Sequence, residues 1–192
     1  MMRLIIVDGL DGVGKDTHAL LIKQRYEQKG EKVILRSHPE SDNYYGRKAK
    51  KALLGTGKVN RLIASVFYAL DVLRSLRLYY NDKSYDTIIL VRYLMGTAYL
   101  PKSMGKFTYS IFKKFVPISE YMFFLDAEPE ELLQRISLRS EIEMFETHDA
   151  LVNVRKKAID LAEGWHIIDT MQPINETYSS IEIVLDLLDL KQ

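Results

Sequence analysis

The chain has 192 residues, of which 47% are hydrophobic and 28% charged, and its formal net charge is +1. These values are typical of a globular protein with a buried core, and they give no general attraction to nucleic acid or to a membrane surface. The absence of cysteine excludes disulfides, thiolate catalysis and cysteine-ligated metal sites. No apolar run reaches the length of a signal sequence or a membrane span, so we expect one cytoplasmic domain over residues 1–192.

Short apolar runs alternate along the chain with longer segments of helical periodicity. The runs predicted as strands are Leu4–Val7, Val33–Leu35, Thr87–Val91, Tyr121–Leu125 and His166–Ile168. The segments predicted as helices are Lys15–Gln28, Leu62–Tyr80, Pro129–Arg139, Leu151–Glu163 and Ile174–Leu190. This alternation predicts a three-layer α/β protein, in which helices cover both faces of a five-stranded parallel sheet. Ligands are expected at the carboxyl ends of the strands.

Two segments fall outside these predicted elements. Gly96–Pro117 is interrupted by glycine and proline, and no element is predicted within it. Leu138–His148 is polar and charged and lies between two predicted helices. We interpret this second segment, residues 138–148, as a mobile lid.

The most specific motif is GLDGVGKDT over Gly9–Thr17, which follows the first predicted strand and leads into the first predicted helix. Strand, glycine-rich turn and helix are the context of a phosphate-binding loop, or P-loop. Glycines tolerate positive φ, so the backbone can wrap around an anion and aim its N–H groups at phosphate oxygens. Lys15 supplies a positive charge for the transferred phosphate. The glycine spacing and the adjoining lysine favour a nucleoside triphosphate over NAD.

Further motifs follow the loop in a fixed order along the chain. They are Arg92-Tyr93, Phe124-Leu125-Asp126, Arg135-Ile136, Phe145-Glu146, Val154-Arg155 and Ile168-Asp169. With these motifs in this order, the chain resembles the thymidylate kinase family of nucleoside monophosphate kinases almost from end to end. The resemblance implies a P-loop NTPase fold and transfer of the γ-phosphoryl group of ATP to dTMP, giving dTDP, with Mg²⁺. It also implies a homodimer, for which the helix predicted over 62–80 is a candidate contact.

The resemblance also gives individual residues candidate roles. The candidates for binding ATP are Gly9, Asp11, Gly12, Val13, Gly14, Lys15, Asp16 and Thr17. The candidates for binding the acceptor nucleotide are Asp11, Arg36, Pro39, Tyr68, Arg92 and Tyr99. The candidate catalytic residues are Lys15, Arg92, Arg135 and Arg139, whose charges would offset those of two anionic substrates. Gly12 stands where one branch of the family has a catalytic arginine, so the lid arginines are expected to supply that charge.

Several positions depart from the family pattern. Val91 replaces the aspartate that usually precedes the Arg-Tyr pair, and Ser37-His38-Pro39 replaces an Arg-Glu-Pro sequence. Arg36 lies one place early, which leaves open whether it reaches the acceptor phosphate. Val72 replaces an arginine that reads a base carbonyl, and the loss of that donor bears on base discrimination.

Asp16 is a further departure, because the strict P-loop motif has Ser or Thr directly after the lysine. In one interpretation Thr17 alone serves the phosphates and Mg²⁺. In the other, Asp16 supplies the carboxylate that is missing at Val91. The second hypothesis predicts that Asp16→Ala abolishes Mg²⁺-dependent turnover and spares the stability of the fold.

Each of these roles has a structural alternative. Arg135 and Arg139 have the spacing of a surface pair on a helix, Arg92 could form an ion pair at a strand end, and Asp11 could stabilise a turn. Three functions therefore stay open at this point: a kinase for dTMP, a kinase of the same fold for another nucleotide, and a nucleotide-binding protein with little or no kinase activity. A phosphoryl-transfer assay across the common nucleoside monophosphates separates them.

Overall fold

The computed structural model describes residues 2–100, 102–138 and 147–191. Within these residues the strands are β1 (Arg3–Gly9), β2 (Val33–Ser37), β3 (Thr87–Val91), β4 (Met122–Asp126) and β5 (His166–Asp169). Neighbouring strands run parallel in the order β2-β3-β1-β4-β5. The five-stranded parallel sheet predicted from the apolar runs is therefore confirmed.

The central strands are buried because their side chains are apolar on both faces. Every residue of β3 is buried, and so is every residue of β1 from Leu4 onward. The last residues of β2 and β3, Ser37 and Val91, pair with each other, and Val91 also pairs with Val7, two residues before the end of β1. Residues that directly follow these three positions therefore lie next to one another at the carboxyl edge of the sheet.

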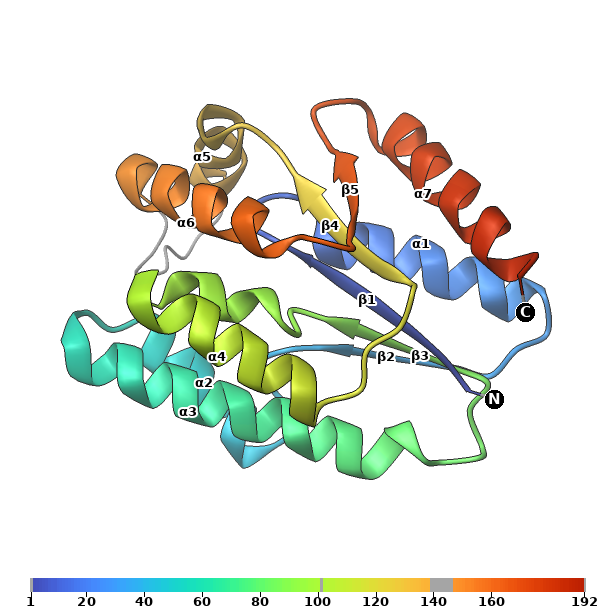
Figure 1. Cartoon of the computed structure of the whole chain (residues 1–192), viewed down its shortest axis with the longest axis horizontal. Coiled ribbons are helices and arrows are strands. Elements are labelled where there is room, and N and C mark those ends of the chain that lie inside the picture. The colour runs from blue at the N-terminus through green and yellow to red at the C-terminus, as the bar shows by residue number, and fades with distance from the viewer. Residues whose placement is uncertain (1, 101, 139–146, 192) are drawn as a thin grey trace.

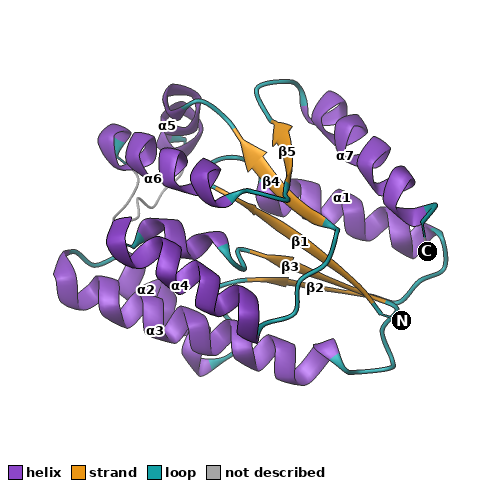
Figure 2. Ribbon diagram, viewed as in Figure 1, coloured by secondary structure: helices purple, strands orange, loops and turns teal. Residues whose placement is uncertain are grey.

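Helices cover both faces of the sheet. They are α1 (Lys15–Gln28), α2 (Tyr44–Leu53), α3 (Gly57–Ser75), α4 (Lys102–Phe115), α5 (Pro129–Ser137), α6 (His148–Leu161) and α7 (Ile174–Asp189), with a short π-helix, η1 (Leu76–Tyr80), and a short 3₁₀-helix, η2 (Met95–Tyr99). Figure 1 shows α3 and α4 on one side of the sheet and α1 and α7 on the other. The strands lie between these helical layers, as the colouring of Figure 2 makes plain. None of the described helices is long and apolar enough to cross a membrane.

The sequence predictions miss two helices, α2 and α4. The start of α2 has a recognisable signal, because the Asn43 side chain caps it by accepting the backbone N–H groups of Tyr45 (2.9 Å) and Gly46 (3.1 Å). In α4 the glycine at position 105 marks a close approach, since a Cβ atom there would lie 3.1 Å from the carbonyl oxygen of Thr97. That glycine is therefore a packing device within the helix and does not end it.

Other predicted boundaries shift by a few residues. The helix predicted over 62–80 begins earlier, at Gly57, and its last turn is the π-helix η1. The helix predicted to end at Arg139 is described as far as Ser137, and α6 begins at His148, within the predicted lid. The rest of that lid, residues 139–146, lies outside the described residues.

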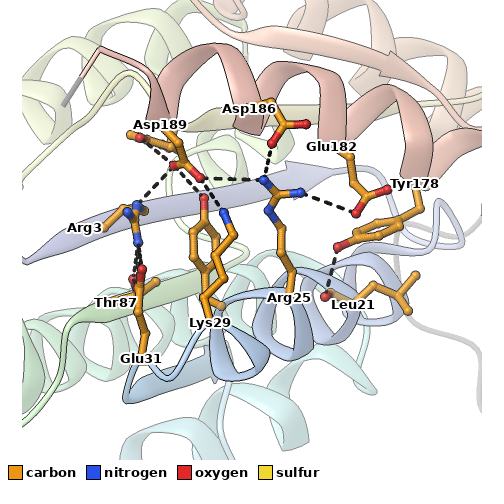
Figure 3. A network of polar contacts seen from close by, with 12 residues as sticks. Arg3, Leu21, Arg25, Lys29, Glu31, Thr87, Tyr178, Glu182, Asp186 and Asp189 are labelled. Atoms are coloured by element: carbon orange, nitrogen blue, oxygen red, sulfur yellow. Dashed lines mark hydrogen bonds and ion pairs between the residues drawn. The ribbon is translucent and has the colours of Figure 1, made fainter.

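The amino end of the sheet is closed by a polar network around Asp189, in the last turn of α7 (Figure 3). One carboxylate oxygen of Asp189 accepts hydrogen bonds of 3.0 Å from the hydroxyls of both Tyr26 and Tyr121. The other accepts a hydrogen bond of 3.1 Å from Lys29 Nζ, and the Arg3 guanidinium lies 3.5 Å from the carboxylate. These contacts fasten α7 to α1 and β1 at the end of the sheet opposite the P-loop.

Candidate active site

The P-loop connects β1 to α1 and has three glycines with positive φ: Gly9, Gly12 and Gly14. Gly9 has no room for a side chain, because a Cβ atom there would lie 2.3 Å from the carbonyl oxygen of Leu125 on β4. Gly12 packs against α5, where a Cβ atom would lie 3.1 Å from the carbonyl oxygen of Leu132. The loop thus runs tightly between β4 and α5, and Gly14 turns the backbone into the N-terminus of α1.

Lys15 is buried beneath this loop. Its Nζ donates hydrogen bonds to the carbonyl oxygens of Gly9 (3.0 Å) and Leu10 (2.5 Å) and lies 3.7 Å from a carboxylate oxygen of Asp11. Burial and the nearby charge of Arg92 lower the pKa of Lys15 to about 8, although Asp11 acts in the opposite direction. The ammonium group is therefore held inside the loop with its charge weakly stabilised, a state that a phosphate anion would stabilise.

Arg92 follows β3 directly and has an unusual backbone. Its φ is 56°, in the left-handed region that non-glycine residues rarely adopt. Its N–H donates to the carbonyl oxygen of Val7 (3.2 Å), and its carbonyl oxygen accepts a hydrogen bond from the Tyr68 hydroxyl. The next three N–H groups all donate to one carboxylate oxygen of Asp8, at 2.8–3.1 Å. Hydrogen bonds to β1 and to Tyr68 of α3 therefore fix the backbone that follows β3.

The Arg92 guanidinium lies among acidic and hydroxyl groups from other elements. Its Nη1 donates to the Asp16 carboxylate (3.1 Å) and to Ser37 Oγ (3.0 Å), and its Nε lies 3.8 Å from Asp11. The Ser37 hydroxyl in turn donates to Asp16. Burial acts to raise the pKa of Asp16, but Arg92, the Ser37 hydroxyl and Lys15 together outweigh it, and the pKa falls below its usual value. For Arg92, burial acts to lower the pKa, but the charges of Asp16 and Asp11 act in the opposite direction, and the pKa of the guanidinium is raised above its usual value.

The predicted acceptor residues Asp11, Tyr68 and Tyr99 lie around this cluster. The Tyr99 hydroxyl donates to Asp11 (2.9 Å), and burial raises the pKa of both tyrosines, so both stay protonated. The Tyr68 ring lies beside Gly96, where a Cβ atom would be 3.3 Å from the ring. Asp11 and Arg92 therefore link the P-loop to the wall made by Tyr68 and Tyr99.

Behind Tyr68 the chain passes through His38 and a cis peptide bond to Pro39. The His38 ring is buried, with one nitrogen 2.9 Å from Ser75 Oγ and the other 3.3 Å from the carbonyl oxygen of Val91. Burial lowers the pKa of His38 to about 4, so the imidazole is neutral at physiological pH. Val72 is also fully buried. His38 and Val72 therefore add no charge to this side of the wall.

Two of the predicted arginines are not brought into the cluster. Arg36 is buried on β2, where it pairs with Asp42 (2.9 Å) and stacks over the ring of Tyr79. Arg135 of α5 donates to Glu131 (2.8 Å) and to the carbonyl oxygen of Thr170 (2.8 Å), on the β5 side of the P-loop. A further predicted arginine, Arg139, lies outside the described residues.

Sequence reasoning missed two functions of acidic residues at the strand ends. These residues are Asp8 of β1 and Asp126 of β4. In the structure Asp8 binds three backbone N–H groups, and burial raises the pKa of its carboxyl group. Asp126 forms a two-pronged pair with Arg155 of α6, with both contacts at 2.9 Å. The arginine of the Val154-Arg155 motif was the available signal for this pair.

Comparison with known proteins gives a consistent result. The family model described as thymidylate kinase matches residues 7–181. The chain belongs to the thymidylate kinase family. A probable thymidylate kinase of Archaeoglobus fulgidus is 27% identical over 207 residues, covering 98% of both chains. One of Sulfurisphaera tokodaii is 25% identical over 194 residues, again covering 98% of both chains. The solved structure of thymidylate kinase from Candida albicans shares the fold, with a TM-score of 0.74 at 17% identity, covering 98% of this chain and 92% of that one.

The donor set near the P-loop fits a magnesium ion bound mostly through substrate. Among the described residues no group of three or more His, Asp or Glu side chains could hold a metal by itself. Thr17 and Asp16 are both exposed on the first turn of α1, and they supply one hydroxyl and one carboxylate. Mg²⁺ commonly takes one or two protein oxygens and completes its shell with phosphate and water, so this sparse set of ligands suits it.

Proposed function

We propose that this protein transfers the γ-phosphoryl group of ATP to dTMP, giving dTDP. The observation that carries the proposal is that Lys15 and Arg92 both lie near Asp11, beyond the carboxyl ends of β1 and β3. One cation belongs to the P-loop and the other to the wall formed by Tyr68 and Tyr99. Two cations that approach one point from a donor side and an acceptor side suit a reaction between two phosphates.

On the donor side, the loop amides and Lys15 would hold the phosphates of ATP. The backbone turns at Gly9, Gly12 and Gly14 aim N–H groups into the loop, and the N-terminus of α1 adds its partial positive charge. A phosphate would give the Lys15 ammonium the counter-charge that burial denies it. Binding the triphosphate and charging Lys15 would therefore favour one another.

On the acceptor side, Arg92 would hold the phosphate of dTMP next to the γ-phosphate. Asp11 would accept a hydrogen bond from the 3′-hydroxyl of the sugar, with Tyr99 bonded to the same carboxylate. The Tyr68 ring would stack on the base, and Pro39 would line the loop behind it. The reaction needs alignment and charge neutralisation and no covalent intermediate on the protein.

Mg²⁺ would be held by the Thr17 hydroxyl, with Asp16 as a second candidate ligand, together with the phosphates. When bound, the ion draws charge from the phosphate oxygens during transfer. Asp16 already contacts Arg92 and Ser37 in the structure, which supports Thr17 as the principal protein ligand.

Closure of the lid would complete the donor side. We assign this role to Arg135 and Arg139, with the lid over residues 138–148 of a kinase domain formed by the whole chain. Arg135 lies beside the P-loop because α5 packs directly on Gly12. Its guanidinium is held by Glu131 and Thr170 at 2.8 Å each, which places its charge at the edge where ATP would extend from the loop.

The proposed homodimer has a candidate surface on α3. Five of its apolar side chains are exposed and recur at intervals of three or four residues, the spacing of one helix face: Val59, Leu62, Val66, Leu70 and Leu73. A row of this kind is typical of a protein interface. In sedimentation velocity the wild type should run as a dimer and Val66→Glu as a monomer. Val152→Glu, on the exposed side of α6, is the matched control. A monomeric wild type would reject the dimer.

The experiment that tests the function is a coupled assay for ADP release with ATP, Mg²⁺ and each common nucleoside monophosphate in turn. We expect the highest kcat/KM with dTMP. Turnover with a different nucleotide, and none with dTMP, would replace the substrate and keep the reaction. Binding of ATP without turnover on any acceptor would contradict the proposal. The cytoplasmic location stays a prediction from the sequence.

A further inference from the structure

Asp16, Ser37 and Arg92 form a closed triangle of hydrogen bonds contributed by three separate elements. Asp16 lies on the first turn of α1, Ser37 ends β2, and Arg92 follows β3. Arg92 Nη1 donates to Ser37 Oγ at 3.0 Å and to the Asp16 carboxylate at 3.1 and 3.4 Å, and the Ser37 hydroxyl donates to Asp16. Each hydrogen bond in the triangle thus has a defined direction: the one from Arg92 to Ser37 ends on the hydroxyl oxygen, and the others end on the Asp16 carboxylate.

The triangle leaves one side of the guanidinium available. All its contacts with Arg92 use Nη1, and Nε lies 3.8 Å from a carboxylate oxygen of Asp11. Among the described residues, no hydrogen bond occupies Nη2. The backbone of Arg92 is held as well, by Val7 on one side and Tyr68 on the other. Arg92 is therefore held at its backbone and at Nη1, and its Nη2 hydrogens make no hydrogen bond with the described residues.

We propose that Asp16 and Ser37 are positioning residues that hold Arg92 in the orientation from which Nη2 takes the acceptor phosphate. This inference rests on the proposed function, and it assigns Asp16 a task separate from the metal. A carboxylate suits the task because it anchors a guanidinium through charge and direction together. Ser37 suits it because one hydroxyl both accepts from Arg92 and donates to Asp16.

The position of Asp16 separates this role from a structural one. Its side chain is 57% exposed, so its pair with Arg92 is largely hydrated and contributes little to folding stability. The same negative charge lies close to where a dianionic phosphate would bind, so it does not favour ground-state binding. What remains is the orientation of Arg92 at the moment of transfer, an effect that appears in kcat.

The first test is the steady-state kinetics of Asp16→Asn, which keeps the shape and removes the charge. We expect kcat with dTMP to fall about 10- to 100-fold, with the KM for dTMP changed less than about threefold and the melting temperature nearly unchanged. Ser37→Ala should give a smaller loss in the same parameter. Glu27→Gln, an acid-to-amide change at the far end of α1, is the matched control and should leave kcat unchanged.

A magnesium titration distinguishes positioning from metal binding. If Asp16 positions Arg92, the Mg²⁺ concentration for half-maximal rate is the same in Asp16→Asn and in the wild type. A shift of about tenfold or more in that concentration would overturn the proposal in favour of a metal ligand. An unchanged kcat, or a loss of rate that follows a loss of folded protein, would also overturn it.

A second readout needs no substrate, so it stays decisive if dTMP is not the acceptor. In ¹⁵N-labelled protein the Arg92 guanidinium signal can be assigned by its loss in Arg92→Lys. We expect hindered rotation of this group in the wild type and in Glu27→Gln, and averaged signals in Asp16→Asn and Ser37→Ala. Averaged signals already in the wild type would overturn the proposal that Asp16 and Ser37 hold Arg92. Failure of the proposed function would instead show only in the turnover assay.

Discussion

The two ends of the sheet both gather arginines and carboxylates, but they use them in opposite ways. At the amino end, Asp189 is surrounded by donors: two tyrosine hydroxyls and Lys29 bond to it, and Arg3 and Arg25 lie within 3.7 Å (Figure 3). At the carboxyl end, Arg92 meets two carboxylates and still keeps Nη2 without a hydrogen bond among the described residues.

This difference separates a cluster that stabilises the fold from one that is prepared for a ligand. A carboxylate with a full set of donors has no capacity left for a substrate, and removing it would leave several buried groups unpaired. A buried lysine and a partly paired arginine in one place retain capacity for anions. Charged clusters alone do not mark a site, but the donors left over in such a cluster do.

The largest expected effect is the loss of turnover on removing the Lys15 charge. Lys15→Met keeps the side-chain volume and should lower kcat about 10³-fold or more, since charge stabilisation at the transferred phosphate is among the largest contributions to such reactions. Initial rates of dTDP formation measure it, and circular dichroism checks the fold. If more than a tenth of the rate remained, the assignment of Lys15 to the phosphates would be wrong.

The corresponding change at the amino end of the sheet is Asp189→Ala. It removes the shared acceptor of Tyr26, Tyr121 and Lys29, so we expect a loss of about 2–3 kcal/mol in the free energy of unfolding. Urea denaturation measures this value. The kcat at 25 °C should be unchanged, because the cluster lies at the opposite end of the sheet from the P-loop.

A matched control for this variant lies one turn earlier on α7. Asp186 is 65% exposed and pairs with Arg25, so Asp186→Ala should cost less than about 1 kcal/mol. Burial acts to raise the pKa of Asp189, but its donors, Lys29 first, lower it below the unfolded value. The stability that Asp189 contributes is thus present at neutral pH and is lost as pH falls through its folded pKa.

Equal losses of unfolding free energy in Asp189→Ala and Asp186→Ala would contradict the difference between the two residues.

The pH dependence of kcat/KM for ATP provides the next test. Burial and Arg92 lower the pKa of Lys15 to about 8, so the free protein loses this cation as pH rises through that value. We expect kcat/KM for ATP to fall about tenfold per pH unit above it, because kcat/KM reports groups of the free enzyme. The kcat should change less, since bound phosphates restore the charge. A flat profile up to pH 9.5 would contradict this.

The smallest expected effect is that of Tyr68→Phe. The variant keeps the ring and removes the hydroxyl that donates to the Arg92 carbonyl oxygen, which should cost about 1 kcal/mol of transition-state stabilisation, or a five- to tenfold loss in kcat/KM for dTMP. Tyr109→Phe is the control, because its hydroxyl bonds Trp165, away from the site. Equal losses in the two variants would remove Tyr68 from the acceptor side.

The sequence was sufficient for the sheet and the P-loop, because buried parallel strands are apolar runs and a glycine-rich loop between a strand and a helix has few other uses. The roles of Lys15 and Arg92 stay predictions. It was insufficient for α4, whose glycine is a packing contact. It was also insufficient for Arg36, because its position one place early does not show that it pairs with Asp42 instead of facing the acceptor site. Nor does spacing show that Ser37 and Asp16 meet: they are 21 residues apart, and they come together because α1 packs against β2.

The contact between Arg3 and Asp189 has a consequence for the path of the chain as a whole. Arg3 begins β1 and Asp189 ends α7, and the 3.5 Å between their side chains brings the first strand and the last helix together at the end of the sheet opposite the P-loop. A short covalent linker between these two elements would therefore join them without crossing the P-loop. Labels or supports attached there would leave the P-loop accessible.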